Sequence, residues 1–104
     1  MELKLFESIA EAKKILKENT PQLVKAAGKN VCIIRREDSL IAFVNECPHL
    51  GESLHRGTVN YLGEIVCPLH TYRFNLDTGE EAEHRCRPLQ FVKVLSEEEV
   101  YLKL

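Results

Sequence analysis

The sequence predicts an all-β fold: an antiparallel β-sandwich with a small subdomain inserted at about residues 47–74 and one N-terminal helix. Beyond Gln22, most apolar residues fall in short runs rich in β-branched side chains, which are typical of strands. Polar or glycine-containing turns separate these runs. Only one segment, before Pro21, repeats its apolar residues at helical spacing. With 104 residues the chain suits one modest core, so we expect a single domain covering 1–104.

The helix is expected from about Ser8 to Glu18. Ser8-Ile9-Ala10-Glu11 has the pattern of a capping box, in which the serine accepts from the helix and the glutamate reaches back to the cap. Proline at position 21 disfavours helix at the residue before it. We expect the apolar face of this helix to cover one edge of the core, with docking of a partner as the alternative; the face consists of Ile9, Ala12, Ile15 and Leu16.

The first strands are expected to form a hairpin. Its strands would be Leu23–Ala26 and Val31–Arg35, joined by a turn at Ala27-Gly28. A competing interpretation starts a second helix at Thr20, with the threonine as N-cap and Pro21 in the first helical position. The β-branched residues after Val31 favour strand there.

The remaining strands follow at short intervals. A polar turn at Glu37-Asp38-Ser39 precedes the next of them, and Glu97-Glu98-Glu99 is a charged turn before the last. The expected strands are Leu40–Val44, Tyr72–Phe74, Phe91–Val94 and Val100–Leu104.

Composition and charge narrow the classes of function. Apolar residues make up 44% of the chain and charged residues 29%, which is ordinary for a globular protein. The net charge of −2 argues against a nucleic-acid partner, because neutralising phosphates requires clustered Lys and Arg. No apolar run is long enough to span a bilayer, and Met1–Phe6 lacks the features of a signal peptide. We therefore expect a cytoplasmic protein with no membrane partner, monomeric when free.

Two short boxes carry the chemistry: Cys47-Pro48-His49-Leu50-Gly51 and Cys67-Pro68-Leu69-His70, with seventeen residues between His49 and Cys67. Thiolate and imidazole bind borderline and soft transition metals well. Together the boxes supply two sulfurs and two nitrogens. This ligand set suits a [2Fe–2S] cluster with mixed ligation, and it is also a tetrahedral zinc set. The prolines and the glycine suit tight loops that aim backbone N–H groups at the cluster.

The boxes and their flanks resemble the Rieske-type ferredoxins. The resemblance runs from about Gln22 to the C-terminus and is tightest from Cys47 to Glu80. CPHLG and CPLH match the family boxes, and an L-x-x-G stretch, an aromatic-x-Phe pair and a closing T-G-E follow the family pattern. Tyr72 stands where many members carry Trp.

The resemblance implies a [2Fe–2S] cluster with Cys47 and Cys67 on one iron and His49 and His70 on the other. It also implies a one-electron carrier with no catalytic residue of its own, which receives electrons from a flavin reductase and passes them to a terminal oxygenase or reductase. An oxygenase catalytic subunit would need a longer chain. The small Rieske-like subunit of an assimilatory nitrite reductase is an alternative within the family. A zinc-stabilised structural module is an alternative outside it.

Two departures from the high-potential members indicate a low-potential centre. Those members carry an extra cysteine in each box and join the pair as a disulfide, but Glu52 and Leu69 stand at these positions here. They also place a serine and a tyrosine after the second box as donors to the cluster sulfurs. Tyr72 and Phe74 replace them, and Phe74 has no donor.

The other cysteines and histidines lie outside the boxes. Cys32, within an apolar run, is expected to be a buried inert thiol. Cys86 lies in a polar connection whose basic neighbours would lower its pKa, although we assign it no function. His55 and His84 are expected in surface or turn positions.

The surroundings of the boxes suggest how partners would approach. Leu50, Leu54 and Leu69 are expected to frame the histidine edge, either as a docking surface or as packing residues. The acidic stretch from Asp77 to Glu83 is expected to be a solvated loop that could steer a basic reductase.

Overall fold

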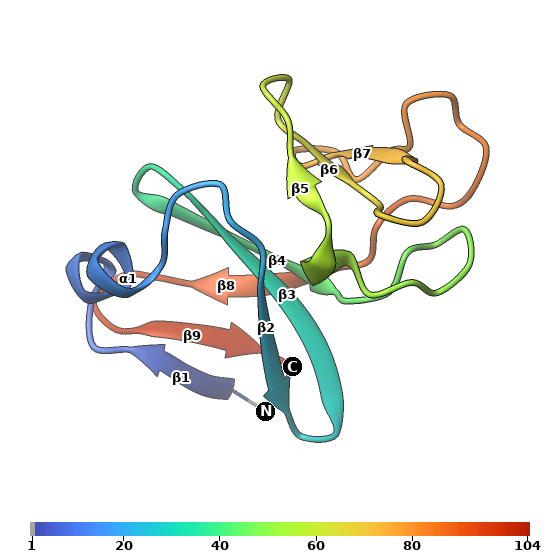
Figure 1. Cartoon of the computed structure of the whole chain (residues 1–104). Coiled ribbons are helices and arrows are strands. Elements are labelled where there is room, and N and C mark those ends of the chain that lie inside the picture. The colour runs from blue at the N-terminus through green and yellow to red at the C-terminus, as the bar shows by residue number, and fades with distance from the viewer. Residues whose placement is uncertain (1) are drawn as a thin grey trace.

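The computed structural model describes residues 2–104 and confirms the all-β prediction, with one short helix. Two antiparallel sheets make up the fold, and Figure 1 shows the smaller one above the larger. In the six-stranded sheet the order is β1-β9-β8-β4-β3-β2, and in the three-stranded sheet it is β5-β6-β7. The strands are β1 (Glu2–Phe6), β2 (Gln22–Ala26), β3 (Lys29–Arg36), β4 (Ser39–Val44), β5 (Thr58–Val59), β6 (Glu64–Val66), β7 (Arg73–Asn75), β8 (Phe91–Leu95) and β9 (Val100–Lys103).

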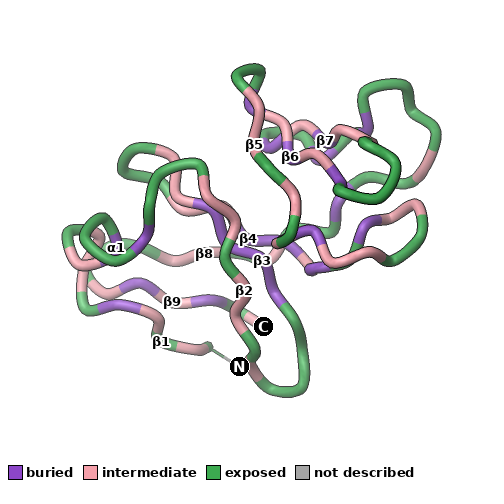
Figure 2. The backbone as a smooth tube through the Cα atoms, in the orientation of Figure 1, coloured by how far each residue is buried: buried purple, intermediate pink, exposed green. Residues whose placement is uncertain are grey.

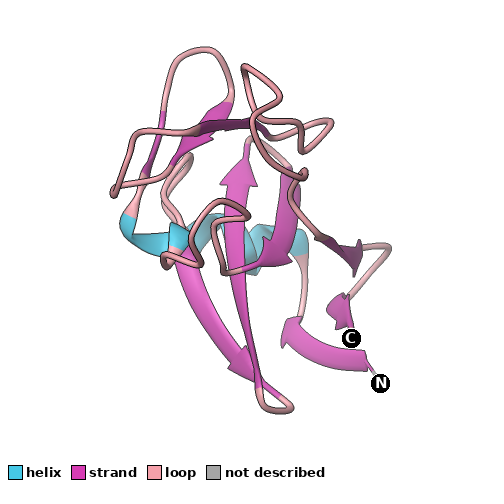
Figure 3. Ribbon diagram, turned by 90° about the vertical axis from the view of Figure 1, so that its right-hand side faces the viewer, coloured by secondary structure: helices cyan, strands magenta, loops and turns pink. Residues whose placement is uncertain are grey.

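Strand β1 is an element that the sequence interpretation did not include. It pairs antiparallel with β9, with Leu3 opposite Leu102. The chain ends meet at this edge of the larger sheet, as Figure 3 shows in the view turned by 90°. Leu3 and Leu5 alternate with charged residues in the way a half-buried strand requires, so the signal was present but short.

Helix α1 (Ile9–Ile15) is shorter than the predicted Ser8–Glu18. Ser8 is the N-cap as expected, and its Oγ accepts from the Glu11 N–H at 3.1 Å. The other half of the capping box differs, because the Glu11 carboxylate accepts from the N–H of Glu7 rather than from the cap. Ile15, expected on the buried face, is 63% exposed.

Arginine 35 explains why the helix ends early. Its Nε donates to the Leu16 carbonyl at 2.8 Å, and its own carbonyl accepts from the Asn19 N–H at 2.8 Å. Residues after Ile15 are thereby drawn alongside β3, where Glu18 forms a bridge with Arg35. A contact distant in sequence has replaced the last helical turn.

The predicted hairpin is present as β2 and β3, and the competing second helix does not form in this segment. Ala26 pairs with Lys29, leaving a two-residue turn in which Ala27 and Gly28 both have positive φ, 51° and 75°. Two consecutive residues of positive φ match the right-handed twist of the strands. Glycine adopts this conformation freely, whereas Ala27 is strained.

Strand β3 is buried on both faces, which accounts for its continuous apolar run. Cys32 and Ile34 belong to one buried cluster, and Val31 and Ile33 belong to the other. Figure 2 shows this burial as purple along the centre of the larger sheet. The second cluster also contains residues of β1, α1 and β9, so the helix covers part of the core, as predicted.

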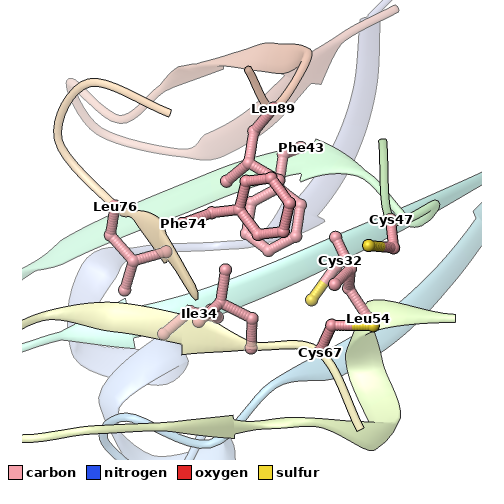
Figure 4. Close-up of a cluster of buried hydrophobic side chains, with 10 residues drawn as sticks. Cys32, Ile34, Phe43, Cys47, Leu54, Cys67, Phe74, Leu76 and Leu89 are labelled. Carbon is pink, nitrogen blue, oxygen red and sulfur yellow. The ribbon is translucent and has the colours of Figure 1, made fainter. Parts of the chain in front are cut away.

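The first buried cluster joins the two sheets and reaches the two Cys/His boxes. Figure 4 shows Phe43 of β4 and Phe74 of β7 within it, with Cys47 and Cys67 at one side. Leu54, in the 3₁₀ turn η1 (Leu54–Arg56), is fully buried in the same cluster. Of the two roles expected for Leu54, the structure shows packing in the core rather than framing of the exposed edge of the boxes.

Within residues 2–104, no helix combines the length and apolar character needed to cross a membrane.

Glycine 57 lets η1 approach β6, and we predict that Gly57→Ala destabilises the fold. A Cβ at this position would lie far inside van der Waals contact of the Val66 carbonyl oxygen, which is backbone and cannot rotate away. We expect a loss of about 3 kcal/mol in the free energy of unfolding, at the upper end of overpacking costs. The measurement is denaturant unfolding.

The matched control for Gly57→Ala is Gly28→Ala. Gly28 has open space around its Cβ position but a φ of 75°, so only backbone strain of about 1 kcal/mol is expected. Equal losses in the two variants would contradict the steric argument.

Candidate metal centre

The first box forms a tight loop after β4. The Cys47 N–H donates to the Glu52 carbonyl at 2.8 Å, and the Gly51 N–H donates to the Cys47 carbonyl at 2.7 Å. Gly51 closes the turn with a φ of 78°, which explains why glycine occupies this position. The loop folds back on its first residue and turns the cysteine toward the core.

The second box repeats this backbone pattern after β6. The Cys67 N–H donates to the Tyr72 carbonyl at 2.8 Å, and the Thr71 N–H donates to the Cys67 carbonyl at 3.0 Å. Thr71 takes the place of the glycine, with a φ of 57°. A β-branched residue is strained in this region, so the loop holds Thr71 there against its own preference. The sequence did not reveal this equivalence, because threonine gives no signal for positive φ.

The two loops bring Cys47 and Cys67 together on their inner side. Both cysteines are almost fully buried in the same cluster, and their thiols lie near enough to act on each other. Burial raises the pKa of Cys47 to about 11, while the N–H groups of His49 and Leu50 act on its sulfur in the opposite direction. A metal that binds here must displace a proton, and the N–H groups then stabilise the thiolate.

His49 and His70 lie together on the outer side of the same loops. Their ring centroids are 5.4 Å apart, with an angle of 59° between the planes. His49 is half-buried and His70 is exposed. Among residues 2–104, the His, Cys, Asp and Glu side chains do not gather in threes around a single point. The boxes instead present a sulfur pair and a nitrogen pair, and a two-iron cluster takes two protein ligands per iron.

Leu50 and Leu69 flank the histidines and are 59% and 49% exposed. No disulfide spans the boxes, since all four cysteines in residues 2–104 are free. Cys32 is fully buried, and burial raises its pKa to about 12, as expected of an inert thiol. The expectation for Cys86 was wrong: burial first, and Glu81 second, raise its pKa and outweigh Arg85 and Arg87.

Tyr72 connects the histidine side to an ion pair between the exposed Arg85 and the buried Glu81. Its ring stacks on His49, with centroids 4.0 Å apart and planes within 4°. The guanidinium carbon of Arg85 lies 3.7 Å from the centroid of the same Tyr72 ring. Arg85 in turn forms two hydrogen bonds with the carboxylate of Glu81, from Nε at 3.0 Å and from Nη2 at 2.7 Å.

The burial of Glu81 corrects one sequence expectation. The acidic stretch was predicted to be solvated, and Asp77, Glu80 and Glu83 are exposed, but Glu81 is 1% exposed. Hydrogen bonds from Arg85 hold the pKa of its carboxyl down at about 2, against the effect of burial. The segment from Glu81 to Arg85 is not helical, so the i, i+4 spacing of the pair gave no signal of this contact in the sequence.

A second polar pair, Asn45 and His55, ties the first loop to η1. The His55 N–H donates to Asn45 Oδ1 at 2.8 Å, and Asn45 Nδ2 lies 2.8 Å from His55 Nδ1. Because the amide oxygen already accepts, Nδ2 must be the donor, so Nδ1 accepts and the ring proton of neutral His55 sits on Nε2. His55 lies in the turn η1, one of the two positions predicted for it, and because Asn45 is buried the pair has a structural role there.

We predict that Asn45→Ala destabilises the protein by about 1–3 kcal/mol, because it leaves the His55 N–H and ring nitrogen without their partners. The measurement is the free energy of unfolding in urea. Asn30→Ala is the matched control, since the Asn30 side chain is exposed and its carbonyl, which accepts from the Asn45 N–H, is retained. A change within about 0.5 kcal/mol is expected for the control. Equal effects in the two variants would contradict the role of the amide pair.

The comparisons with known proteins agree with this geometry. The family model described as "Rieske [2Fe-2S] domain" matches residues 7–94. A curated relative, the carnitine monooxygenase oxygenase subunit of Acinetobacter baumannii, is 34% identical over 79 residues, covering 75% of this chain and 21% of the relative. The chain therefore spans about a fifth of the length of that relative.

Solved structures share the fold over nearly the whole chain. The ferredoxin of carbazole 1,9a-dioxygenase from Nocardioides aromaticivorans IC177 has a TM-score of 0.79 and 27% identity, covering 98% of this chain and 96% of that one. A chain from a complex of reduced oxygenase and oxidised ferredoxin in carbazole 1,9a-dioxygenase has a TM-score of 0.79 and 30% identity, covering 99% and 96%.

A putative nitrite reductase small subunit also has this fold, with a TM-score of 0.76 and coverage of 100% and 99%, but at 19% identity. The likeness there concerns the fold alone. The match of the family model extends over both boxes and most of the two sheets. This chain belongs to the Rieske [2Fe-2S] domain family.

Proposed function

We propose that this protein is a one-electron carrier, a Rieske ferredoxin whose [2Fe–2S] cluster is held by Cys47 and Cys67 on one iron and by His49 and His70 on the other. The observation that carries the proposal is the pairing of the side chains, with two buried thiols in one cluster on the inner side and two neighbouring imidazoles on the outer side. The likeness to ferredoxins over 96% of their length supports a carrier of this kind.

The cluster supplies one-electron chemistry when bound. The protein residues decide where it is exposed and how much negative charge surrounds it. Cys47 and Cys67 keep their end out of water, whereas His70 keeps the other end at the surface. Neutral imidazoles contribute no negative charge, so an added electron meets less repulsion than it would beside four thiolates.

We further propose that the electron donor is a flavin reductase and that the acceptor is a terminal oxygenase or reductase. The structure of a ferredoxin in complex with its oxygenase, at 30% identity to this chain, supports an oxygenase as acceptor. The exposed side chains of Leu50 and Leu69 offer an apolar rim beside the histidines for such contacts. The cytoplasmic location, the single domain and the monomeric state stay predictions from the sequence.

The test of the ligand assignment is the iron content and the EPR spectrum of the dithionite-reduced protein. We expect two irons per chain and a rhombic signal in the wild type, and loss of both in Cys67→Ser and His70→Gln. The matched controls are Cys86→Ser and His84→Gln, which make the same changes outside the boxes. Stoichiometric zinc without iron, or loss of iron in the controls alone, would contradict the assignment.

We also predict a low midpoint potential, below zero and toward the lower end of the range of about −150 to +300 mV that Rieske centres cover. Position 74, where the high-potential members place a donor, is a buried phenylalanine with no polar hydrogen. Fewer donors to the cluster sulfurs stabilise the reduced state less. Redox titration followed by circular dichroism gives the value, and a midpoint well above zero would refute the prediction.

A further inference from the structure

We propose that Arg85 and Glu81 are positioning residues for His49, acting through the ring of Tyr72; the proposal rests on the proposed role of His49 as a cluster ligand. Arg85 and His49 both lie within van der Waals contact of the Tyr72 ring. The guanidinium carbon of Arg85 is 3.7 Å from the ring centroid, and the centroid of the His49 ring is 4.0 Å from it. Two groups at these distances cannot share one face of a ring. Tyr72 is therefore held between a guanidinium and an imidazole.

The carboxylate of Glu81 fixes the plane of the guanidinium. Arg85 donates to it from Nε, Nη2 and the backbone N–H, at 3.0 Å, 2.7 Å and 2.8 Å. The fork of an arginine matches a carboxylate in one plane, which a lysine cannot reproduce. Arg85 thus approaches Tyr72 in one orientation.

The backbone around Glu81 fixes that carboxylate in turn. Glu81 forms a bridge with Phe74 of β7, and the Ala82 N–H donates to the Arg73 carbonyl at 2.9 Å. Because Phe74 is fully buried, the position of Glu81 is set by the core rather than by the exposed connection around it. The series Glu81, Arg85, Tyr72 and His49 therefore runs from a rigid strand to an imidazole at the surface.

An imidazole on a tight loop has two side-chain torsions that the loop alone does not set. The nearly parallel stack on Tyr72 restricts the plane of the His49 ring, and an outer residue that orients a ligand strengthens metal binding. Mutation of such a residue typically costs 10–100-fold in metal affinity or activity, so we expect losses on the order of tenfold. His70, by contrast, is exposed, and its ring lies tilted by 59° to that of His49 instead of stacked.

The test compares Arg85→Gln and Arg85→Lys with the wild-type holoprotein. The lysine variant retains the charge and loses the planar fork, so a positioning role predicts that both variants are affected. We expect iron release to a chelator to be faster by on the order of tenfold, together with altered g-values or broader lines in the EPR spectrum of the reduced protein. Tyr72→Leu, which removes the stacked ring, should reproduce both effects.

Arg87→Gln is the matched control, because Arg87 is exposed and the substitution removes the same charge two residues away from Arg85. Its iron release and EPR spectrum should equal those of the wild type. A purely structural role for Arg85 would lower thermal stability without changing the EPR spectrum, and that result would overturn the proposal, as would equal behaviour of Arg85→Gln and Arg87→Gln. If Arg85→Gln does not fold, the comparison of Arg85→Lys with Arg87→Gln decides. Wild-type protein that holds no iron cluster would instead refute the proposed function.

Discussion

The two loops that carry the Cys/His boxes are held side by side by a single apolar cluster that joins the smaller sheet to the larger. Cys47 follows β4 and Cys67 follows β6, so the proximity of their thiols depends on how these sheets pack. Phe43 and Phe74 fill the space between them, one from each sheet. Protein interiors are close-packed, so a shift in either sheet would be transmitted to the loops. Each box supplies one of the two cysteines, and tertiary packing brings the two sulfurs together.

Strand β3 extends this dependence to the rest of the chain. Its residues alternate between the cluster beneath the boxes and the cluster that contains β1, α1 and β9. The N-terminal segment therefore supports the site from a distance by packing on the opposite face of the larger sheet. The short helix adds the buried Ala12 to this layer but leaves Ile15 in water, which agrees better with a cover for the core than with an extended docking face.

The boxes and the first hairpin could be predicted from the sequence because their signals are local. The boxes are short motifs in which residue type and spacing state the chemistry directly, and the hairpin of β2 and β3 has its turn residues between two apolar runs. The remaining features depend on partners distant in sequence. Strand β1 needs β9, and the end of α1 is set by Arg35. The short alternation at Leu3 and Leu5 does not name β9 as the partner of β1, and no pattern near the helix announces Arg35.

The same reason explains why polar residues near the site were misjudged. A glutamate within an acidic stretch is normally solvated, and only the approach of Arg85 and the bridge to Phe74 bury Glu81. Nothing in the sequence around Asn45 indicates its hydrogen bonds with His55, which form only in the folded chain. Burial of a polar group is decided by whether its partners arrive, which is a property of the folded chain.

The two sides of the boxes differ in their exposure to water. Around the thiols the surroundings are apolar and closed, so a change of charge there receives little help from water. Around the histidines the surface is open, and Leu50 and Leu69 extend it with apolar side chains. An added negative charge is stabilised better at the open end, where water and neutral imidazoles surround it, than at the thiolate end. If the protein is the proposed electron carrier, a partner that binds over the leucines would exclude this water on contact, so we expect partner binding and electron transfer to be coupled at the histidine side.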